Sequence, residues 1–518
     1  MNRNDSHRLF SGLAVLGLAA LCSVPAAAQR DRNPPRPEAP PAAVPSAPPA
    51  ADKGDYNKLP PLPGDKSVDQ SIVLNGKTLH YTVTVGTLPV REPDGKIAGN
   101  LVYTAYTVDQ PNRPVTFAVN GGPGAASVFL NFGAIGPKHL DGIGNKDDSA
   151  SEPIHFSDNQ GTWLGFTDLV FLDPIGTGFS RSLVDPAEAK KLFFGPVPDV
   201  DYLSAAIYDW LVKNGRMTSR KYMVGESYGG YRVPRIVYNL QSNLGVAMNG
   251  EVLVSPYMNP AVGSQADLSP LPWMLTLPSI TAANLERQGK LTSDAMQPVI
   301  AYTEGDYATA LIKGNSDPSL QQAMIQKVTE MTGLDPTFVR ESGGRLETEA
   351  YLREVWREQG KVGSVYDSNV TMFDPFPWSP WPQANDPLLA SMVGPTTTGM
   401  VDFVTQTVGW KTEAQYYALS YDVARNWDRA SPAMREGSVT QLRDAVAADP
   451  QFRVVIAHGW DDLSCPFMGS VLTVNEMPVM GDPARVSVHE FPGGHMFYTR
   501  ESSRVAFQKV VEDMYSKH

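Results

Sequence analysis

Three short apolar runs in this chain each end abruptly in a glycine-rich segment. The runs and the segments that follow them are 115–119 before 120–124, 169–172 before 173–178, and 222–224 before 225–230. A continuous apolar run is typical of a strand that is buried on both faces of a sheet. Between the second and third runs, Leu203, Ile207 and Leu211 recur at helical spacing. This order of strand, loop, helix and strand predicts an α/β fold with a mostly parallel central sheet.

The two ends of the chain add further elements to this sheet. Near the N-terminus, Asn75-Gly76 is a strong hairpin signal between apolar runs, and Asp94-Gly95 indicates a second hairpin. Near the C-terminus, the predicted elements are a helix at 441–448, strands at 453–457 and 484–491, and a helix at 503–515. Between these parts, from about residue 261 to 437, the sequence pattern indicates helices and shows no strand alternation. The predicted helices there are 321–332, 346–359 and 413–427.

The pattern divides the chain into five parts. They are a signal peptide at 1–28, a Pro/Ala-rich disordered linker at 29–66, a first core segment at 67–260, a helical cap insertion at 261–437 and a second core segment at 438–518. The linker is assigned from its proline content, since such a segment cannot bury enough apolar area to offset its ordering entropy.

The first 28 residues read as an export signal. Arg3 and Arg8 precede an apolar stretch at 9–24, and small residues at 26–28 give an A-x-A cleavage pattern. The stretch is shorter than the ~20 apolar residues that a transmembrane helix needs. Cys22 offers a lipoprotein alternative, although a lipid-anchor site normally has a small residue where this chain has Leu21. We expect a periplasmic or secreted protein without membrane attachment after cleavage.

Charge and cysteine content exclude several classes of function. The chain has 43 Lys and Arg against 55 Asp and Glu, a net charge of −12, and no basic run, so nucleic acid is not an expected partner. The only cysteines are Cys22 and Cys465, which rules out a disulfide scaffold and a cysteine-based zinc site. No metal or cofactor is predicted.

The segment 225–229 reads GESYG and fits G-x-S-x-G, a sharp strand-to-helix turn that exposes a serine hydroxyl. Its place between a predicted strand and a predicted helix makes Ser227 the candidate nucleophile. A base and an acid should follow in the order Ser, Asp or Glu, His. His495 lies in a loop between the last strand and the last helix and is the candidate base. Asp461 and Asp462 both follow the preceding strand, and spacing alone does not choose between them.

Five segments together resemble the serine carboxypeptidase family, as a bacterial secreted member. They are NGGPG at 120–124, DPIGTGFS at 173–180, GESYGG at 225–230, GWDDLSC at 459–465 and GHM at 494–496. They follow the family's order over about residues 115–500. The resemblance implies an α/β-hydrolase fold with an inserted helical cap. It also implies that the enzyme removes C-terminal residues from peptides through an acyl-enzyme, without a cofactor.

The resemblance also assigns roles to residues. Ser227 matches the nucleophile and His495 the base, and the family pattern G-x-x-D-x-x-C selects Asp462 as the acid. The backbone N–H groups of Gly122 and Tyr228 match the oxyanion hole.

For substrate recognition, the resemblance implies that Asn120 and Glu226 hold the substrate's C-terminal carboxylate. A glutamate in that role must be protonated, because two like charges in contact do not both ionise cheaply. The family's second glutamate is absent, since Ala134 stands in its place. We therefore hypothesise that Lys138 or Arg232 supplies a cationic partner for the carboxylate.

Other functions stay open at this point, because a triad fixes the reaction type and not the substrate. An esterase, an acyltransferase or a proline-directed aminopeptidase would use the same three residues on a peptide or a small acyl substrate. A catalytically silent binding protein is the alternative from a different class.

Overall fold

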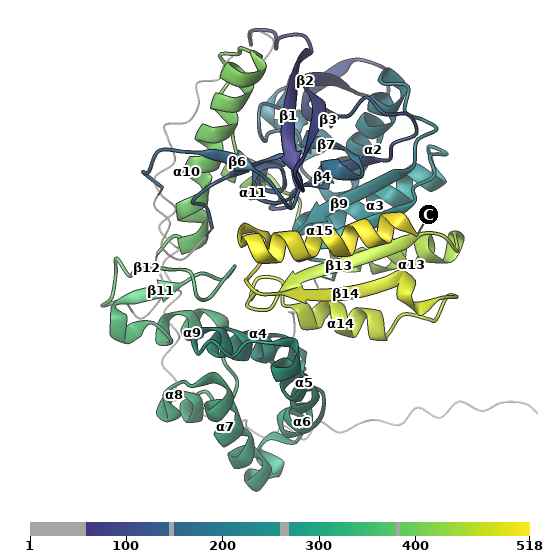
Figure 1. Ribbon diagram of the computed structural model, residues 1–518. Helices are drawn as coiled ribbons and strands as arrows, with labels where there is room; N and C mark the ends of the chain where they lie inside the picture. Colours follow the sequence, from purple (N-terminus) through teal and green to yellow (C-terminus); the bar gives the residue numbers. More distant parts are fainter. Residues whose placement is uncertain (1–58, 145–149, 260–268, 380–383, 518) are drawn as a thin grey trace, which may run out of the picture. The chain divides into compact units, whose positions relative to one another are not determined.

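A ten-stranded sheet forms the centre of the fold in the computed structural model (Figure 1). The structure describes residues 59–144, 150–259, 269–379 and 384–517. The predicted signal peptide and most of the predicted linker therefore lie outside the described residues. Asp65, just before the first strand, forms an ion pair with Lys213 at 2.6 Å.

The sheet has the order β1-β2-β3-β7-β4-β9-β10-β13-β14, and β8 pairs with β3. The strands are β1 Lys66–Leu74, β2 Lys77–Arg91, β3 Ile97–Thr107, β4 Val115–Val119, β7 Asp168–Asp173, β8 Arg181–Ser182, β9 Lys221–Glu226, β10 Gly250–Val254, β13 Arg453–Gly459 and β14 Val486–Phe491. In the order of the sheet, the strands from β7 to β14 pair in parallel. The pairs β1–β2, β2–β3, β3–β7 and β3–β8 are antiparallel. The predicted mostly parallel sheet is thus confirmed.

Both predicted N-terminal hairpins are confirmed. Strands β1 and β2 pair from Leu74 opposite Lys77, and the two loop residues, Asn75 and Gly76, both have positive φ. This is the backbone twist that a two-residue hairpin needs, and Asn-Gly is the pair that adopts it most readily. The second hairpin joins β2 to β3 across a looser turn that contains Gly95.

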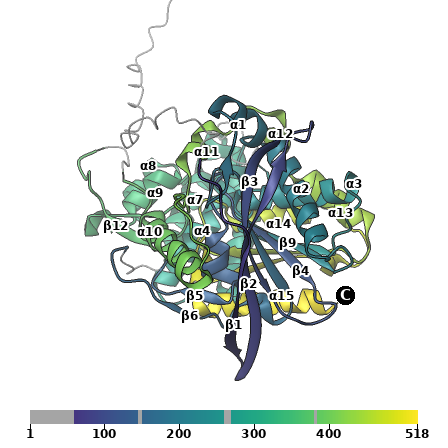
Figure 2. The same cartoon turned by 90° about the horizontal axis from the view of Figure 1, so that it is seen from above.

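Helices cover both faces of the sheet (Figures 1 and 2). On one face, α2, α3 and α13 pack through residues such as Ile207, Val237 and Leu442. On the other face, α15 packs through Phe507 and Val511. The core helices are α1 Pro186–Phe193, α2 Pro196–Lys213, α3 Tyr228–Ser242, α13 Val439–Ala448, α14 Phe467–Asn475 and α15 Glu501–Ser516. The segment in which Leu203, Ile207 and Leu211 recur at helical spacing corresponds to α2, and the predicted helices at 441–448 and 503–515 correspond to α13 and α15.

The part of the chain between β10 and α13 is mainly helical. Its helices are α4 Leu271–Arg287, α5 Ser293–Tyr302, α6 Ala308–Lys313, α7 Pro318–Thr332, α8 Pro336–Glu341, α9 Thr348–Glu354, α10 Pro387–Asp402, α11 Tyr421–Asn426 and α12 Pro432–Glu436. The short strands β11 Lys361–Gly363 and β12 Thr371–Phe373 pair with each other, a hairpin that the sequence pattern does not reveal. Strands of three residues are too short to show alternation.

The predicted helix at 413–427 is wrong over its first half. Only α11 is helical there, and the residues before it run extended against the core. Tyr417 bridges Gly178, and Leu419 bridges Ala125, in both cases by antiparallel backbone pairing. Pairing with two glycine-rich loops of the core therefore overrides the local helical preference.

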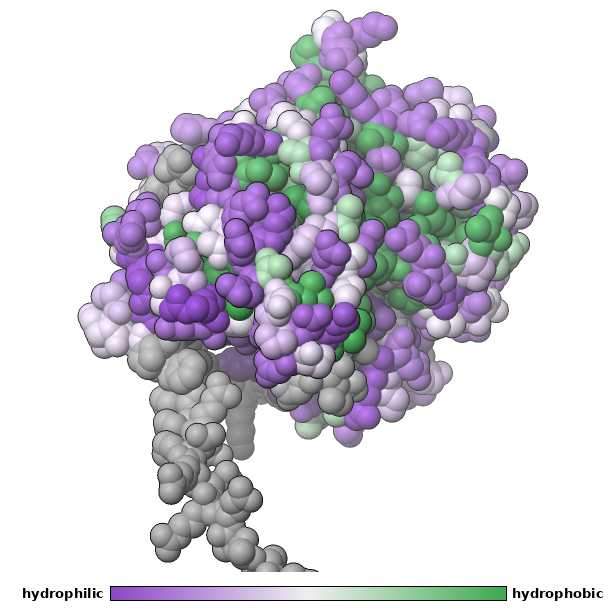
Figure 3. All heavy atoms as spheres, turned by 90° about the horizontal axis from the view of Figure 1, so that it is seen from below, coloured by the Kyte–Doolittle hydropathy of each residue, from purple (hydrophilic) through white to green (hydrophobic). Residues whose placement is uncertain are grey.

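The surface of the described residues is mixed. Hydrophilic residues cover most of the face in Figure 3, and hydrophobic residues gather on the right of that view. In the part of the chain that the structure describes, no helix is both long and apolar enough to cross a membrane.

Glu251 is a buried carboxyl group at the centre of the sheet. It lies in β10 between β9 and β13, is fully buried, and neither of its oxygens has a hydrogen-bond partner among the described residues. Burial raises the pKa of Glu251 to about 8. The neutral form is therefore the one that the fold accommodates.

Glu251 should make the protein less stable as the pH rises. Its pKa in the fold, about 8, exceeds the ordinary 4.5, so the stability that depends on its proton is complete below pH 4.5 and is lost as the pH rises through 8. The loss is roughly 1.4 kcal/mol per pH unit within that window. Glu251→Gln stays neutral at every pH. The melting temperature of this variant minus that of the wild type should therefore increase between pH 5 and pH 8. The exposed Glu476→Gln serves as the control, and an equal gain in both variants would contradict the argument.

Candidate active site

Ser227 lies in a sharp turn between β9 and α3. Its φ of 59° and ψ of −122° are a left-handed conformation that residues other than glycine rarely adopt. Its N–H donates to the carbonyl of Val254 in β10 at 2.9 Å, and its carbonyl accepts from the N–H of Tyr257 at 3.0 Å. These bonds to the neighbouring segment hold the serine at the end of the sheet.

Glycines allow the loop after β4 to approach this turn closely. A Cβ atom on Gly121 would lie 2.5 Å from the backbone nitrogen of Tyr228, and one on Gly225 would lie 2.4 Å from the carbonyl oxygen of Gly229. Neither position accepts a side chain. The loop therefore brings its backbone at Gly121 against the start of α3.

His495 and Asp462 contact each other through the side chains. The Nδ1 atom of His495 lies 2.7 Å from Oδ2 of Asp462, and both residues are buried. The other carboxylate oxygen, Oδ1, accepts from the N–H groups of Ser464 and Cys465 at 2.8 and 2.9 Å. The Asp462 carboxylate thus has three hydrogen-bond partners, two of them backbone N–H groups of its own loop. Its contact with His495 fixes which ring nitrogen carries the proton.

The neighbouring aspartate has different partners. Asp461 Oδ2 accepts from Nδ2 of Asn369 at 3.2 Å, and Asp461 makes no contact with His495 among the described residues. Of the two aspartates that spacing leaves open, the one hydrogen-bonded to the imidazole is Asp462.

Of the seven residues predicted for the triad, the oxyanion hole and carboxylate binding, five are buried, Ser227 is partly buried and Gly122 is exposed. Six of the seven line one cavity of about 250 Å³. Those six are Asn120, Gly122, Glu226, Ser227, Tyr228 and His495. Asp462 lies behind His495 and does not line the cavity. The cavity thus combines a hydroxyl, an imidazole, a carboxyl group and the backbone of two glycine-rich turns.

Glu226 is the carboxyl group at this cavity. Its Oε2 atom accepts from Nδ2 of Asn120 at 2.7 Å and from the hydroxyl of Tyr498 at 2.7 Å. Tyr498 is fully buried and lies three residues after His495, in the short 3₁₀ helix η10, Phe497–Thr499. Sequence reasoning misses Tyr498, because a tyrosine in a loop carries no signal of its partner.

The pKa values of Glu226 and His495 are both shifted upward. Burial raises the pKa of Glu226 to about 7, although the positive charge of His495 and the bonds from Tyr498 and Asn120 oppose the rise. Burial alone would lower the pKa of His495, but the charge of Asp462 outweighs it and the net pKa of His495 is raised. Glu226 therefore keeps its proton far above the ordinary range of a glutamate.

Neither of the two cations proposed as carboxylate partners lines this cavity. Lys138 forms an ion pair with Asp158 at 2.6 Å. Arg232 is buried, pairs with Asp199 at 2.6 Å and donates to the carbonyl of Asn120 at 2.5 Å. Arg232 thus supports the backbone next to the cavity from behind. The arginine that does line the cavity is Arg429, on the exposed segment after α11.

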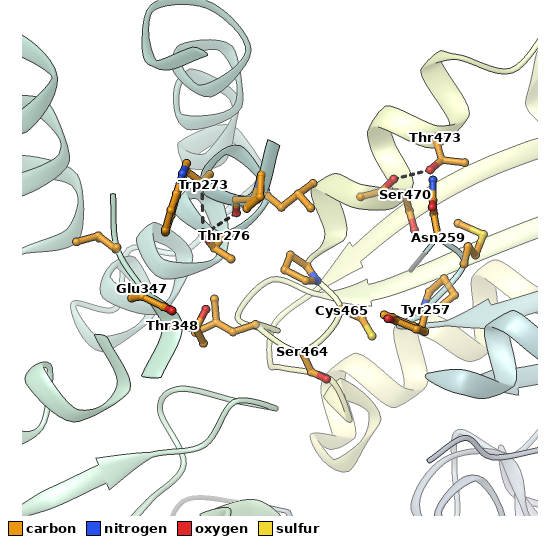
Figure 4. A pocket seen from close by; sticks show the side chains of 18 residues that line it. Tyr257, Asn259, Trp273, Thr276, Glu347, Thr348, Ser464, Cys465, Ser470 and Thr473 are labelled. Atoms are coloured by element: carbon orange, nitrogen blue, oxygen red, sulfur yellow. Dashed lines mark hydrogen bonds between the residues drawn. The ribbon is translucent and has the colours of Figure 1, made fainter. Parts of the chain in front are cut away.

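A second cavity of about 320 Å³ adjoins the first. The two share Tyr257, Ser464 and Cys465. Figure 4 shows Trp273 and Thr276 of α4 on one side of the second cavity and the segment after β13 on the other. Its further lining is largely apolar and includes Pro256, Met258, Pro272, Leu275, Leu346 and Leu463.

Three carboxylates, those of Glu286, Asp367 and Asp461, lie within 4.8 Å of one another behind the site. A guanidinium group already meets their charge, because Arg500 contacts Glu286 and lies 2.8 Å from Asp367. These contacts form an ion-pair network that joins α4 and the β11–β12 hairpin to the loops after β13 and β14.

Part of the chain is similar in sequence to known serine carboxypeptidases. The serine carboxypeptidase family model matches residues 97–328. Serine carboxypeptidase-like 50 of Arabidopsis thaliana is 31% identical over 157 residues, which are 30% of this chain and 32% of that protein. Pheromone-processing carboxypeptidase KEX1 of Yarrowia lipolytica is 28% identical over 204 residues, 39% of this chain and 29% of that protein. The chain thus matches about a third of the length of these relatives.

These matches show that part of the chain is similar to serine carboxypeptidases. Among solved structures, Kex1, a prohormone-processing carboxypeptidase from Saccharomyces cerevisiae, superposes with a TM-score of 0.52 at 16% identity, covering 84% of this chain and 91% of that one. At this identity the likeness bears on the fold, and it confirms the predicted α/β-hydrolase fold.

The two adjacent aspartates allow a sharp test of the site. Diisopropyl fluorophosphate should label Ser227, and Asp462→Asn should slow labelling by about 10³-fold or more, because the amide favours the wrong imidazole tautomer. Asp461→Asn, the matched control, should label within a few-fold of the wild-type rate. Mass spectrometry of the labelled peptide measures both. Equal slowing in the two variants would remove the reason for choosing Asp462.

Proposed function

We propose that this protein is a serine-type carboxypeptidase that removes C-terminal residues from peptides. The observation that supports it best is the buried carboxyl group of Glu226, which lines the cavity beside Ser227 and has a pKa raised to about 7. A carboxyl group that keeps its proton donates a hydrogen bond to a carboxylate, whereas two ionised carboxylates repel. This chemistry favours a substrate with a free C-terminus over an ester or an amide.

In the proposed acylation step, the Ser227 hydroxyl oxygen attacks the scissile carbonyl carbon while Nε2 of His495 takes its proton. Asp462 holds the proton on Nδ1 and stabilises the imidazolium that forms. The backbone N–H groups of Gly122 and Tyr228 donate to the oxyanion. The C–N bond then breaks, and His495 gives its proton to the amine of the departing amino acid.

In the proposed deacylation step, water takes the place of the departed amine. His495 accepts a proton from the water as its oxygen attacks the acyl carbon. The ester bond breaks, the proton returns to Ser227, and the shortened peptide leaves with a new carboxyl group, which releases the second proton of the water to the solvent. Atoms and charges balance with the residues of this chain and one water molecule.

Peptidase activity should fall on the alkaline side. For a peptide with a free C-terminus, kcat/KM should decrease about tenfold per pH unit above the pKa of Glu226, because only its protonated form binds the carboxylate. That pKa is about 7. Glu226→Gln keeps a neutral donor at every pH, so its profile should lose this alkaline limb. The measurement is kcat/KM between pH 5 and pH 9.

The control for this prediction is a substrate without the carboxylate. An N-blocked peptide ester should show no alkaline limb from Glu226 in either protein. Comparison of N-blocked peptides, peptides with a free N-terminus and simple esters also separates a carboxypeptidase from an aminopeptidase and an esterase. The same alkaline limb in Glu226→Gln would refute the assigned role of Glu226.

The second cavity is the proposed binding site for the side chain on the acyl side of the scissile bond. A C-terminal carboxylate at Glu226 occupies the first cavity, and the second cavity contains neither Glu226 nor Asn120. It opens from the first at Tyr257, so the acyl part of the substrate extends in that direction. The largely apolar lining favours a bulky apolar side chain.

Filling the second cavity tests its role. Thr276→Trp should lower kcat/KM for peptides with a penultimate Phe or Leu by about tenfold or more, while peptides with a penultimate Gly stay within a few-fold. The exposed Thr309→Trp on α6 is the control for the added indole. A uniform loss for both peptides, or none for either, would contradict the assignment.

The export of the protein and its division into parts complete the proposal. The predicted signal peptide at 1–28 supports a periplasmic or secreted location, with the linker at 29–66 as a spacer. A bacterial source is part of this proposal, whereas the relatives named above come from a plant and a yeast. The segment 261–437 is the proposed cap, inserted between core segments 67–260 and 438–518.

A further inference from the structure

The segment that would carry a second recognition glutamate contains no carboxyl group in this chain. Ala134 lies in the π-helix η2, Phe129–Ile135, and is buried. The ring of Tyr498 packs beside this segment, since a Cβ atom on Gly133 would lie 2.8 Å from its Cε2 atom. The ring of Tyr498 therefore lies beside Gly133, the residue that precedes Ala134.

Tyr498 also makes a directed bond to the remaining glutamate. Its hydroxyl donates to Oε2 of Glu226 at 2.7 Å, and Nδ2 of Asn120 donates to the same oxygen at 2.7 Å. Among the described residues, Oε1 of Glu226 accepts no hydrogen bond. Burial raises the pKa of Tyr498 well above its ordinary value, so the phenol stays a donor throughout the working range of pH.

We propose that Tyr498 is a positioning residue that orients Glu226 for recognition of the substrate's C-terminal carboxylate, in place of the carboxyl group absent at Ala134. With both donors on Oε2, the proton of neutral Glu226 is directed to Oε1. That atom is then free to donate to the carboxylate of a peptide in the cavity. The inference rests on the carboxypeptidase function proposed above and names the residue that completes its recognition site.

The surroundings of Glu226 set the direction of the expected effect. The titratable groups that influence it are His495, Asp462, Cys465 and Tyr498. The bond from Tyr498 favours the charged form and so lowers the pKa of Glu226 against the effect of burial. Without that bond the pKa of Glu226 must rise, and the neutral carboxyl group must lose its fixed orientation.

The test is Tyr498→Phe, which removes one buried oxygen and keeps the ring. The alkaline midpoint of kcat/KM for an N-blocked peptide with a free C-terminus should move upward by about one pH unit. At pH 6 the KM for this peptide should rise about tenfold with kcat within a few-fold, because the loss is one of binding. The matching N-blocked ester should be unaffected.

The control is Tyr515→Phe, which removes another buried tyrosine hydroxyl, bonded to Thr116 at 2.7 Å, far along α15. A merely structural loss would lower stability in both variants and leave the midpoint unchanged. In a Glu226→Gln background, Tyr498→Phe should shift no midpoint at all. An unchanged midpoint and KM in folded Tyr498→Phe would overturn the proposal.

A spectroscopic readout separates this inference from the proposed function. The infrared C=O band of protonated Glu226, identified as the band lost in Glu226→Gln, reports its titration without substrate. Tyr498→Phe should move this titration to higher pH and shift the band. A wild type that does not distinguish peptide acids from amides would contradict the carboxypeptidase function. An unmoved infrared titration would contradict the coupling of Tyr498 to Glu226, whatever the substrate.

Discussion

The left-handed turn at Ser227 is the constraint on which the rest of the site depends. A serine at a φ of 59° costs of order 1–3 kcal/mol, so the surrounding structure must enforce it. Strand β9 is well placed for this, because it lies between β4 and β10 in the middle of the sheet. The loop after β4 presses against the turn, and Val254 of β10 accepts its N–H. The parallel strands β13 and β14 end at the same edge, which brings Asp462 and His495 to the serine.

Two buried groups at one cavity compete for a proton. The proposed chemistry needs His495 neutral and Glu226 neutral, whereas Asp462 favours a charged imidazole, and a charged imidazole in turn favours an ionised Glu226. Ionisation of either residue therefore affects the pKa of the other. A free carboxylate in the cavity adds a negative charge beside Glu226 and so favours its protonated form. The substrate itself thus helps to select the active protonation state.

Local chemistry decides which features the sequence could predict. The Asn75-Gly76 hairpin and the buried strands that end in glycine-rich loops are specified by neighbouring residues, and both were predicted. The local pattern of segment 413–427 favours a helix. The pairing that overrides it in the first half is with Gly178 and Ala125, which lie more than 200 residues away and leave no signal in the local sequence. Spacing did not separate Asp461 from Asp462, since only contact with His495 does so. Tyr498, Arg429 and the true partners of Lys138 and Arg232 are likewise properties of three-dimensional packing.

The adjacent aspartates connect the loops of the candidate triad to helix α4. Asp462 contacts His495, while the N–H of Asp461 donates to the carbonyl of Gly493, two residues before His495, at 2.9 Å. The side chain of Asp461 faces Asn369, which also binds Glu286 of α4. Arg500, five residues after His495, contacts Glu286 as well. The loops that carry the acid and the base are therefore tied to each other and to a helix of the insertion. Without that helix, Arg500 would lose a carboxylate partner in a largely buried position, which is a costly arrangement. The geometry of His495 thus depends on α4 as well as on the sheet.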